Sequence, residues 1–217
     1  TLLVSLIAKE GAADNKAAGA QALYALCVDQ PEAQKEVASA GGIKPLVALL
    51  GEEDDNARRQ GAGAIAALCN GSTENKDAIE KFRGISKLVG LLSSNFGHKV
   101  RAQAAAALSV LARDHPKNQD QIAALGGIEP LVKLLHVIKG DSANQRVTSM
   151  QKWSPSETEE VSVRERVVEE AASALWSLSF QHNQNQIAVA DAEGIPPLVA
   201  AIGLRSERAQ EQAAGAL

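Results

Sequence analysis

The chain has 217 residues, of which 45% are apolar and only 3% aromatic, and its formal net charge is −4. This charge argues against a dedicated nucleic-acid-binding protein, which usually presents a strongly basic face. No apolar run reaches the roughly 18 residues of a membrane span, and the two cysteines are too few for a disulfide framework.

The scarcity of aromatic residues means that alanine, leucine and valine must build the core. Alanine and leucine rank high in helix propensity, so this composition favours closely packed helices. Cys27 and Cys69 lie in matching contexts, YALCV and AALCN, and we expect both to be small buried residues. Free cysteines indicate a reducing compartment, so the expected location is the cytoplasm, with the nucleus as an alternative.

The chain opens with a partial unit at 1–29, in which an alanine-rich helix is predicted at 15–28. Residues 30–71 hold the first full unit, in the order short helix, glycine turn, medium helix, polar loop, long helix. Its three predicted helices lie at 31–40, 41–50 and 57–70. Pro31 suits the start of a helix, and alanines and leucines at steps of three and four give the long helix a wide apolar face.

The same order of segments recurs along the rest of the chain. The glycine-led segment GGIKPLVALL at 41–50 returns as RGISKLVGLL at 83–92, GGIEPLVKLL at 126–135 and EGIPPLVAAI at 193–202. The repeat length is about 42 residues, in the range of helical solenoids. Gly41, Gly84, Gly126 and Gly194 are each predicted to end a short helix in a left-handed conformation.

These segments divide the chain into one array. The predicted units are a partial repeat at 1–29, repeats at 30–71, 72–113 and 114–182, and a partial repeat at 183–217. No helix of a unit can bury its apolar face alone, whereas stacked units share a continuous core. We therefore expect an all-α, right-handed solenoid. Both chain ends fall inside predicted helices, which favours a longer array.

The repeat at 114–182 is interrupted by a polar insertion at 139–162, which is predicted to be a loop. Ser162-Val-Arg-Glu165 resembles a capping box that restarts the long helix. Met150 or Trp153 could anchor the insertion on a neighbouring surface. Ser154 and Ser156 are candidate phosphorylation sites, and an unmodified surface loop is the alternative.

Three motifs carry a resemblance to the armadillo repeat. They are N-x-x-x-I in the short helix (Asn75 to Ile79, Asn118 to Ile122), G-G-I-x-P-L-V-x-L-L, and A-A-x-A-L-x-x-L at the end of the long helix. The resemblance spans essentially the whole chain apart from the insertion. It implies a non-enzymatic scaffold that binds extended peptides or partner domains along a concave groove lined by the third helices.

Importin-α-like armadillo proteins carry Trp and, four residues later, Asn on the third helix. The alignment here uses Leu26, Leu68, Leu108 and Leu178. The Trp position then holds Tyr24, Ala66, Ala106 and Trp176, and the Asn position holds Val28, Asn70, Val110 and Phe180. No repeat has both residues, which argues against classical nuclear-import binding by this segment. The basic residues considered next make the chain resemble catenin-like armadillo proteins more closely, and that resemblance implies a groove that takes acidic peptides.

In this alignment Arg59 and Lys99 occupy one position of adjacent repeats. They are expected to point into one groove about 10 Å apart, where Asn70 and Gln103 could help them to hold an acidic, extended segment. The alternative is that both are solvated surface charges. Ser173 is a further predicted groove residue.

Trp176 and Phe180 lie on one helix face, because they are four residues apart. They could anchor an apolar side chain of a partner, since aromatic residues are enriched among such anchors. Alternatively, they pack against the insertion or the next repeat. These two aromatic residues are therefore predicted either to bind a partner or to stabilise the array.

We expect no enzymatic activity, cofactor or metal site. The four histidines show no metal-ligand spacing, and no nucleophile or phosphate-binding motif is present. The expected function is a protein-interaction scaffold that binds along the groove. The alternatives are a structural subunit docked through 139–162 and, third, a nuclear-import-type cargo adaptor.

Overall fold

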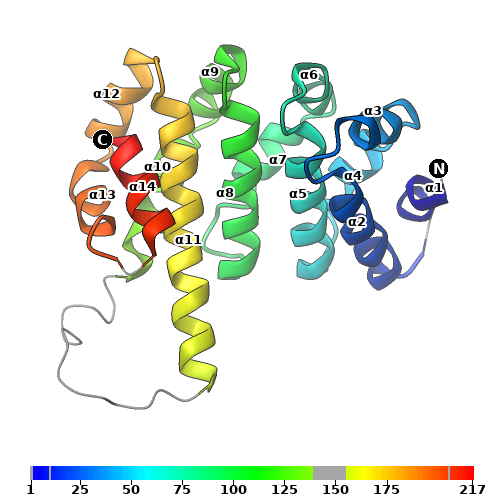
Figure 1. Cartoon of the computed structure of the whole chain (residues 1–217), viewed down its shortest axis with the longest axis horizontal. Coiled ribbons are helices and arrows are strands. Elements are labelled where there is room, and N and C mark those ends of the chain that lie inside the picture. Colours follow the sequence, from blue (N-terminus) through cyan, green and yellow to red (C-terminus); the bar gives the residue numbers. More distant parts are fainter. Residues whose placement is uncertain (1, 10, 139–154, 205) are drawn as a thin grey trace.

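A computed structural model describes residues 2–9, 11–138, 155–204 and 206–217. Over these residues the secondary structure is helical, and no strand is present among them. Successive helices stack along one axis, so the two termini lie at opposite ends of the array (Figure 1). No helix in the described ranges is long and apolar enough to cross a membrane.

The helices follow the predicted order of short, medium and long elements. The first two are α1 (Leu2–Ala8) and α2 (Ala13–Cys27). They are followed by α3 (Pro31–Ser39), α4 (Ile43–Leu49) and α5 (Asp55–Cys69), and then by α6 (Thr73–Lys81), α7 (Gly84–Gly90) and α8 (His98–Ala112). The remaining helices are α9 (Pro116–Ala124), α10 (Ile128–Leu135) with the 3-10 turn η1 (His136–Ile138), α11 (Pro155–Ser179), α12 (Asn183–Asp191), α13 (Ile195–Ala201) and α14 (Glu207–Ala216).

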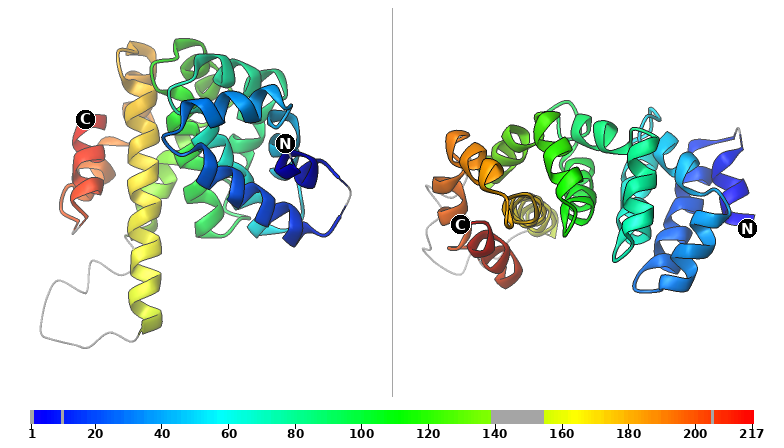
Figure 2. Two further views of the ribbon diagram at one scale, coloured as in Figure 1. Left: turned by 45° about the vertical axis from the view of Figure 1, so that its right-hand side comes forward. Right: turned by 90° about the horizontal axis from the view of Figure 1, so that it is seen from above.

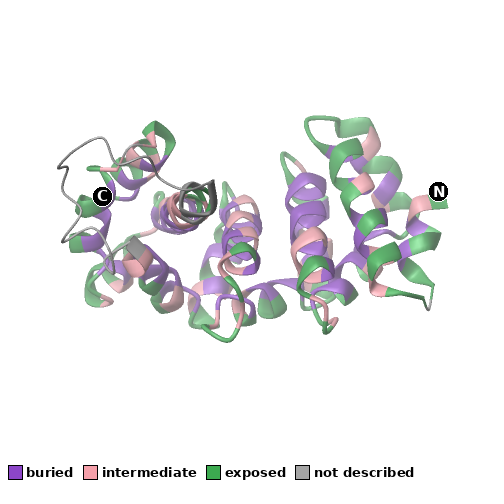
Figure 3. Ribbon diagram, turned by 90° about the horizontal axis from the view of Figure 1, so that it is seen from below, coloured by how far each residue is buried: buried purple, intermediate pink, exposed green. Residues whose placement is uncertain are grey.

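The long helices form one side of a curved array. Each of α2, α5 and α8 packs against the next long helix, and α11 packs against α14. Seen from above, these helices lie along the inner side of the curve (the right-hand view of Figure 2). Buried residues lie between neighbouring helices along the whole array (Figure 3). This core consists mainly of alanine, leucine, isoleucine and valine and includes both cysteines, Cys27 and Cys69.

The predicted left-handed caps hold in two units and are wrong in the other two. Gly41 and Gly126 have φ of 78° and 74°. In the other two units the left-handed residue is Arg83 or Glu193, each with φ of 59°, one position before the predicted glycine. The error arose because the glycine pair G-G is reduced to R-G and E-G there, and only the second glycine was kept.

Gly84 and Gly194 serve close packing instead of a left-handed turn. A Cβ at Gly84 would lie 2.5 Å from Cγ2 of Ile79, and one at Gly194 would lie 2.8 Å from Cγ1 of Val189. The same Cβ at Gly84 would lie 3.2 Å from Cγ2 of Val47 in the preceding unit. The second glycine therefore lets two neighbouring units approach closely.

Buried asparagines show which residues of the long helices are equivalent. The Nδ2 atoms of three asparagines donate to the carbonyl oxygen seven residues earlier, at distances of 2.7 to 2.9 Å. The pairs are Asn75 with Leu68, Asn118 with Leu111, and Asn185 with Leu178. Leu111 is therefore the equivalent of Leu68, and the alignment on Leu108 is wrong by three residues.

The slip arose because α8 carries buried leucines at both positions, Leu108 and Leu111. In the corrected register the Trp position of α8 holds Ser109 and the Asn position holds Arg113. Still, no unit has both Trp and Asn. Ala102, rather than Lys99, is equivalent to Arg59.

The insertion is shorter than predicted, because α11 already begins at Pro155. The expected loop over 155–162 and the capping box at Ser162 are therefore wrong. Polarity suggested a loop, yet a helix that protrudes into solvent is also polar, and Pro at its start with glutamates in its first turns favours helix formation. Met150, Trp153 and Ser154 lie outside the described residues, and Ser156 lies in the first turn of α11.

The early start makes α11 the longest helix among the described residues. It has 25 residues, whereas α2, α5 and α8 have 15 each. Ten additional residues add about 15 Å at the rise of an α-helix. The extension protrudes beyond the ends of the other long helices (Figures 1 and 2).

Candidate functional site

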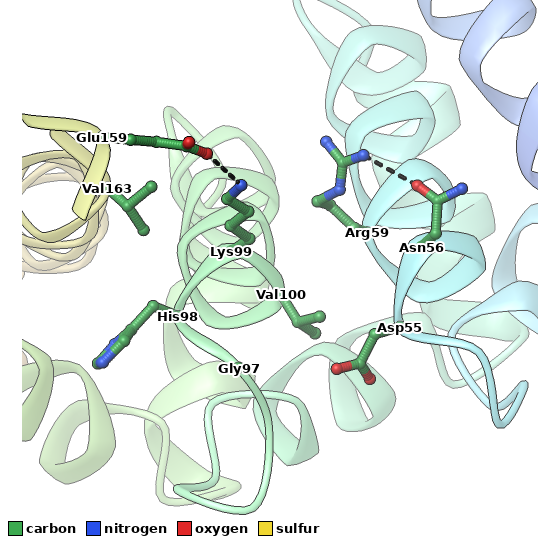
Figure 4. A pocket seen from close by; sticks show the side chains of 9 residues that line it. All are labelled: Asp55, Asn56, Arg59, Gly97, His98, Lys99, Val100, Glu159 and Val163. Atoms are coloured by element: carbon green, nitrogen blue, oxygen red, sulfur yellow. Dashed lines mark hydrogen bonds and ion pairs between the residues drawn. The ribbon is translucent and has the colours of Figure 1, made fainter. Parts of the chain in front are cut away.

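A cleft of about 560 Å³ lies where the N-terminal parts of α5, α8 and α11 meet (Figure 4). Its lining comes from three successive long helices and the residue before α8. The residues are Asp55, Asn56, Arg59, Gly97, His98, Lys99, Val100, Glu159 and Val163. The structure thus places Arg59 and Lys99, the two basic residues predicted to share a groove, in the lining of one cleft.

Lys99 already has an acidic partner from the next unit. Its Nζ lies 3.0 Å from Oε1 of Glu159 on the extension of α11. The two side chains are 61% and 70% exposed, so water screens the attraction between them. This contact depends on the unexpected helical segment at 155–162, which brings Glu159 beside α8.

Arg59 lies on the facing helix α5 and has a neutral partner. Its Nη2 donates to Oδ1 of Asn56 at 2.9 Å. No carboxylate within the described part of the chain forms an ion pair with Arg59. The guanidinium charge is therefore not neutralised by direct contact.

The start of α5 is fixed by its own polar contacts. Asp54 caps the helix by accepting from the backbone N–H of Ala57 at 2.6 Å. Asp55 pairs with Arg58 at 2.6 Å, and the Arg58 guanidinium lies 4.9 Å from the centre of the Phe96 ring. These contacts hold the helix end from which Arg59 extends into the cleft.

A second, smaller hollow of about 380 Å³ lies at the C-terminal ends of α8 and α11, beside α14. Its lining residues are Arg113, Asp114, Trp176, Ser177, Phe180 and Gln212. Phe180 is 49% exposed. The indole of Trp176 packs on α14, since a Cβ at Gly215 would lie 2.5 Å from its Cδ2. Trp176 therefore contributes to packing of the array and also lines this hollow, while its role in binding a partner stays a prediction. Arg113 was missed because of the register slip in α8.

Tyr24 and Gln103 both lie close to α5, on either side of Gly63. A Cβ at Gly63 would lie 3.3 Å from Nε2 of Gln103 and 3.7 Å from Cδ2 of Tyr24. Tyr24 is 43% exposed, and Asn70 is exposed at the end of α5. These three residues lie along α2, α5 and α8, but none of them lines the cleft of Arg59 and Lys99.

Ser173 does not line a groove, so its prediction is wrong. It is 5% exposed, and its Oγ lies 2.9 Å from Oγ of Ser109 on α8. The Ser109 hydroxyl also lies 3.0 Å from Oγ of Ser177. These hydroxyls form a buried polar contact between α8 and α11. Ser173 shares a helix face with Trp176 and Ser177, but it lies one turn earlier, where α8 covers that face.

Polar side chains tie three of the short helices, α3, α6 and α9, to the end of the next long helix. Gln34 Nε2 donates to the carbonyl oxygen of Ala67 at 2.9 Å, Lys76 Nζ to that of Arg113 at 2.5 Å, and Gln119 Nε2 to that of Ser177 at 2.8 Å. Burial lowers the pKa of the Lys76 amine. Sequence reasoning missed these contacts, although the sequence shows a polar residue three positions before the buried Val or Ile of each short helix.

Two of the four histidines are explained by helix capping. His115 and His182 each accept, at Nδ1, the backbone N–H three residues later, at 3.3 Å. Their Nε2 atoms lie 3.5 Å from Asp77 and 2.9 Å from Asp120, respectively. Within the described residues, no group of three or more His, Cys, Asp or Glu side chains could hold a metal ion.

Comparison with known proteins gives structural relatives only. No family model matches the sequence, and no curated protein matches it. Two crystal structures of engineered proteins superpose on 99% of this chain with a TM-score of 0.79, at 27% and 26% identity, and the chain covers 76% and 78% of them. A third engineered protein gives a TM-score of 0.77 at 29% identity, with 99% of this chain and 46% of that chain covered. These similarities establish an all-helical, repeat-type fold for the chain.

Proposed function

We propose that the chain is a non-enzymatic, armadillo-type interaction scaffold that binds an acidic, extended partner segment along the inner side of its long helices. The observation that carries this proposal is the cleft in which Arg59 and Lys99 face each other from α5 and α8. The fold provides the surface, whereas the charges in the cleft suggest what binds there.

The armadillo assignment is supported by the unit itself. Each unit of about 42 residues has a short, a medium and a long helix, and asparagine and glycine recur at the positions that join successive units. The array curves with its long helices on the inner side (Figure 2). A right-handed superhelix of three-helix repeats is therefore the architecture that we propose.

The preference for an acidic segment follows from the two cations of the cleft. Arg59 has only a neutral contact, with Asn56, and Lys99 already holds one carboxylate, that of Glu159. A partner carboxylate would form a charge-assisted hydrogen bond with Arg59, and such bonds are stronger than neutral ones. The long helices repeat side by side, so an extended segment can contact several units in turn.

The second hollow offers a place for an apolar side chain of the same partner. Phe180 is half exposed there, and Trp176 and Arg113 complete the lining. Aromatic and arginine side chains are enriched among residues that dominate binding energy. The partner would then combine acidic residues for the cleft with one apolar residue for this hollow.

The proposal can be tested with the double variant Arg59→Glu, Lys99→Glu and a fluorescein-labelled oligoglutamate peptide. Fluorescence anisotropy should show binding by the wild type that weakens as salt is added, because exposed charges are screened. The double variant should lose this binding. The matched control is Lys35→Glu, Lys133→Glu, which changes the net charge equally at exposed positions on α3 and α10.

The result that contradicts the proposal is equally clear. Equal affinity of the wild type and the Arg59, Lys99 variant would remove the cleft from the binding site. Equal loss in the control variant would mean that only overall charge matters. A peptide array that returned basic rather than acidic segments would instead favour a nuclear-import-type adaptor.

A second candidate is a structural subunit that docks into a larger assembly through the region 139–162. The observation that favours it is the extension of α11, which protrudes beyond the other long helices (Figure 1). Deletion of 139–162 should then release the protein from that assembly without loss of the remaining helices. Retention in the assembly after the deletion would refute this candidate.

A further inference from the structure

Glu159 holds a particular place in the cleft, because it comes from the extension of α11 rather than from a partner. Figure 4 shows its carboxylate directed toward the amine of Lys99, while Arg59 extends from the facing helix. The Lys99–Glu159 pair joins residues 60 positions apart in the sequence. The chain thus places its own carboxylate at one of the two cations proposed to recognise an acidic partner.

We propose that Glu159 is an internal competitor for the acidic partner, an inference that rests on the proposed function. In the empty cleft the Glu159 carboxylate pairs with the Lys99 amine. When a segment binds, one of its carboxylates replaces that of Glu159. The α11 extension thereby sets the threshold for binding, because only a partner that compensates for the lost internal ion pair gains from contact with Lys99.

The geometry makes this exchange feasible. Both side chains of the ion pair are exposed, and they make a single contact at 3.0 Å. Exposed pairs of this kind stabilise a fold very little. Val163, one turn later on α11, also lines the cleft. Release of Glu159 therefore leaves the remaining wall of the cleft in place.

The two cations then play unequal roles. Arg59, whose contact is the neutral Asn56 amide, can accept a carboxylate without displacing another. Lys99 accepts one only by exchange with Glu159. A segment with several carboxylates is favoured over one with a single carboxylate, because it can occupy Arg59 first and then compete for Lys99 at high local concentration.

The test compares Glu159→Gln with the wild type in the oligoglutamate anisotropy assay at low salt. The variant should bind about two- to fivefold more tightly, the range that corresponds to an exposed ion pair. The matched control is Glu129→Gln, which removes the same charge from an exposed pair with Lys133 on α10, outside the cleft. This control should leave the affinity unchanged.

A double-mutant cycle makes the assignment specific. In a Lys99→Gln background the substitution Glu159→Gln should have no effect on affinity, because its partner is gone. Circular dichroism is used to verify equal helix content in all variants.

Each outcome has one meaning. Unchanged affinity in Glu159→Gln, with clear binding by the wild type, overturns the competitor and leaves the proposed function intact. Equal tightening by Glu129→Gln, or an undiminished effect in the Lys99→Gln background, also overturns it, because overall charge then explains the gain. Absence of binding in every variant, the wild type included, contradicts the proposed function itself.

Discussion

The joint between successive units can be tested within the single helix α7, which begins and ends with a glycine. At Gly84 a Cβ would lie 2.5 Å from Cγ2 of Ile79, 3.1 Å from the Ile79 carbonyl oxygen and 3.2 Å from Cγ2 of Val47. At Gly90 nothing lies within 4 Å of the added Cβ. Alanine at these two positions should therefore have opposite effects on the free energy of unfolding.

The magnitudes follow from these contacts. Gly84→Ala forces one extra carbon against a buried side chain and a carbonyl oxygen, and overpacking of this kind costs about 1–3 kcal/mol. Gly90→Ala only removes the excess conformational freedom of glycine in a helix and should stabilise by about 0.5–1 kcal/mol. The double variant Ile79→Leu, Gly84→Ala should recover part of the loss, because leucine lacks the branching Cγ2 at this position.

Urea denaturation followed by circular dichroism measures the two free energies. Hydrogen exchange of the α6 and α7 amides localises the loss, since units of an array contact only their neighbours. If Gly84→Ala were as stable as the wild type, the second glycine would not be a packing requirement, and the account of how units join would be refuted.

Three further predictions concern buried polar groups. Burial raises the pKa of the Glu170 carboxyl, so the folded state binds its proton more strongly than the unfolded state. Stability therefore falls as pH rises above the ordinary value of 4.5. Glu170→Gln should flatten this dependence when urea midpoints are measured against pH. Burial lowers the pKa of the Lys76 amine, so stability should rise as pH increases toward the ordinary value of 10.5. The variant Lys76→Gln, which has the residue type found at the equivalent position 34, should abolish that rise. Gln119→Ala leaves the carbonyl oxygen of Ser177 without this donor and should cost about 1–3 kcal/mol, with faster amide exchange in the last turn of α11; unchanged exchange would contradict its role.

Much of the fold could be predicted from the sequence because the pattern repeats. Each unit must bury the same faces, so the alanines, the leucines and the segment G-I-x-P-L-V recur at one spacing. The repeat therefore remains recognisable where one unit departs from the pattern. Pro31 marks a helix start as expected, and Pro116 begins α9 in the same way. The roles of the two glycines in each G-G pair were harder to predict. The first adopts the left-handed conformation and the second allows close packing, and the sequence does not distinguish these two requirements.

The candidate site was predicted less well, since it depends on departures from the repeat. Leucines three residues apart in α8 concealed the true register, in which Arg113 holds the Asn position and lines the second hollow. The polar composition of 155–162 is compatible with both a loop and a solvated helix, so Glu159 was not expected beside Lys99. Contacts between side chains from different units are set by helix rotation and length, which periodicity does not determine.

The proposed function requires above all that the inner side of the long helices binds an acidic segment at Arg59 and Lys99. The most direct measurement is a titration of the isotope-labelled protein with the oligoglutamate peptide, followed by amide chemical shifts in NMR spectra. We expect the saturable shifts to concentrate at the N-terminal parts of α5, α8 and α11. Shifts confined to the short helices α3, α6 and α9, or no saturable shifts at low salt, would contradict it.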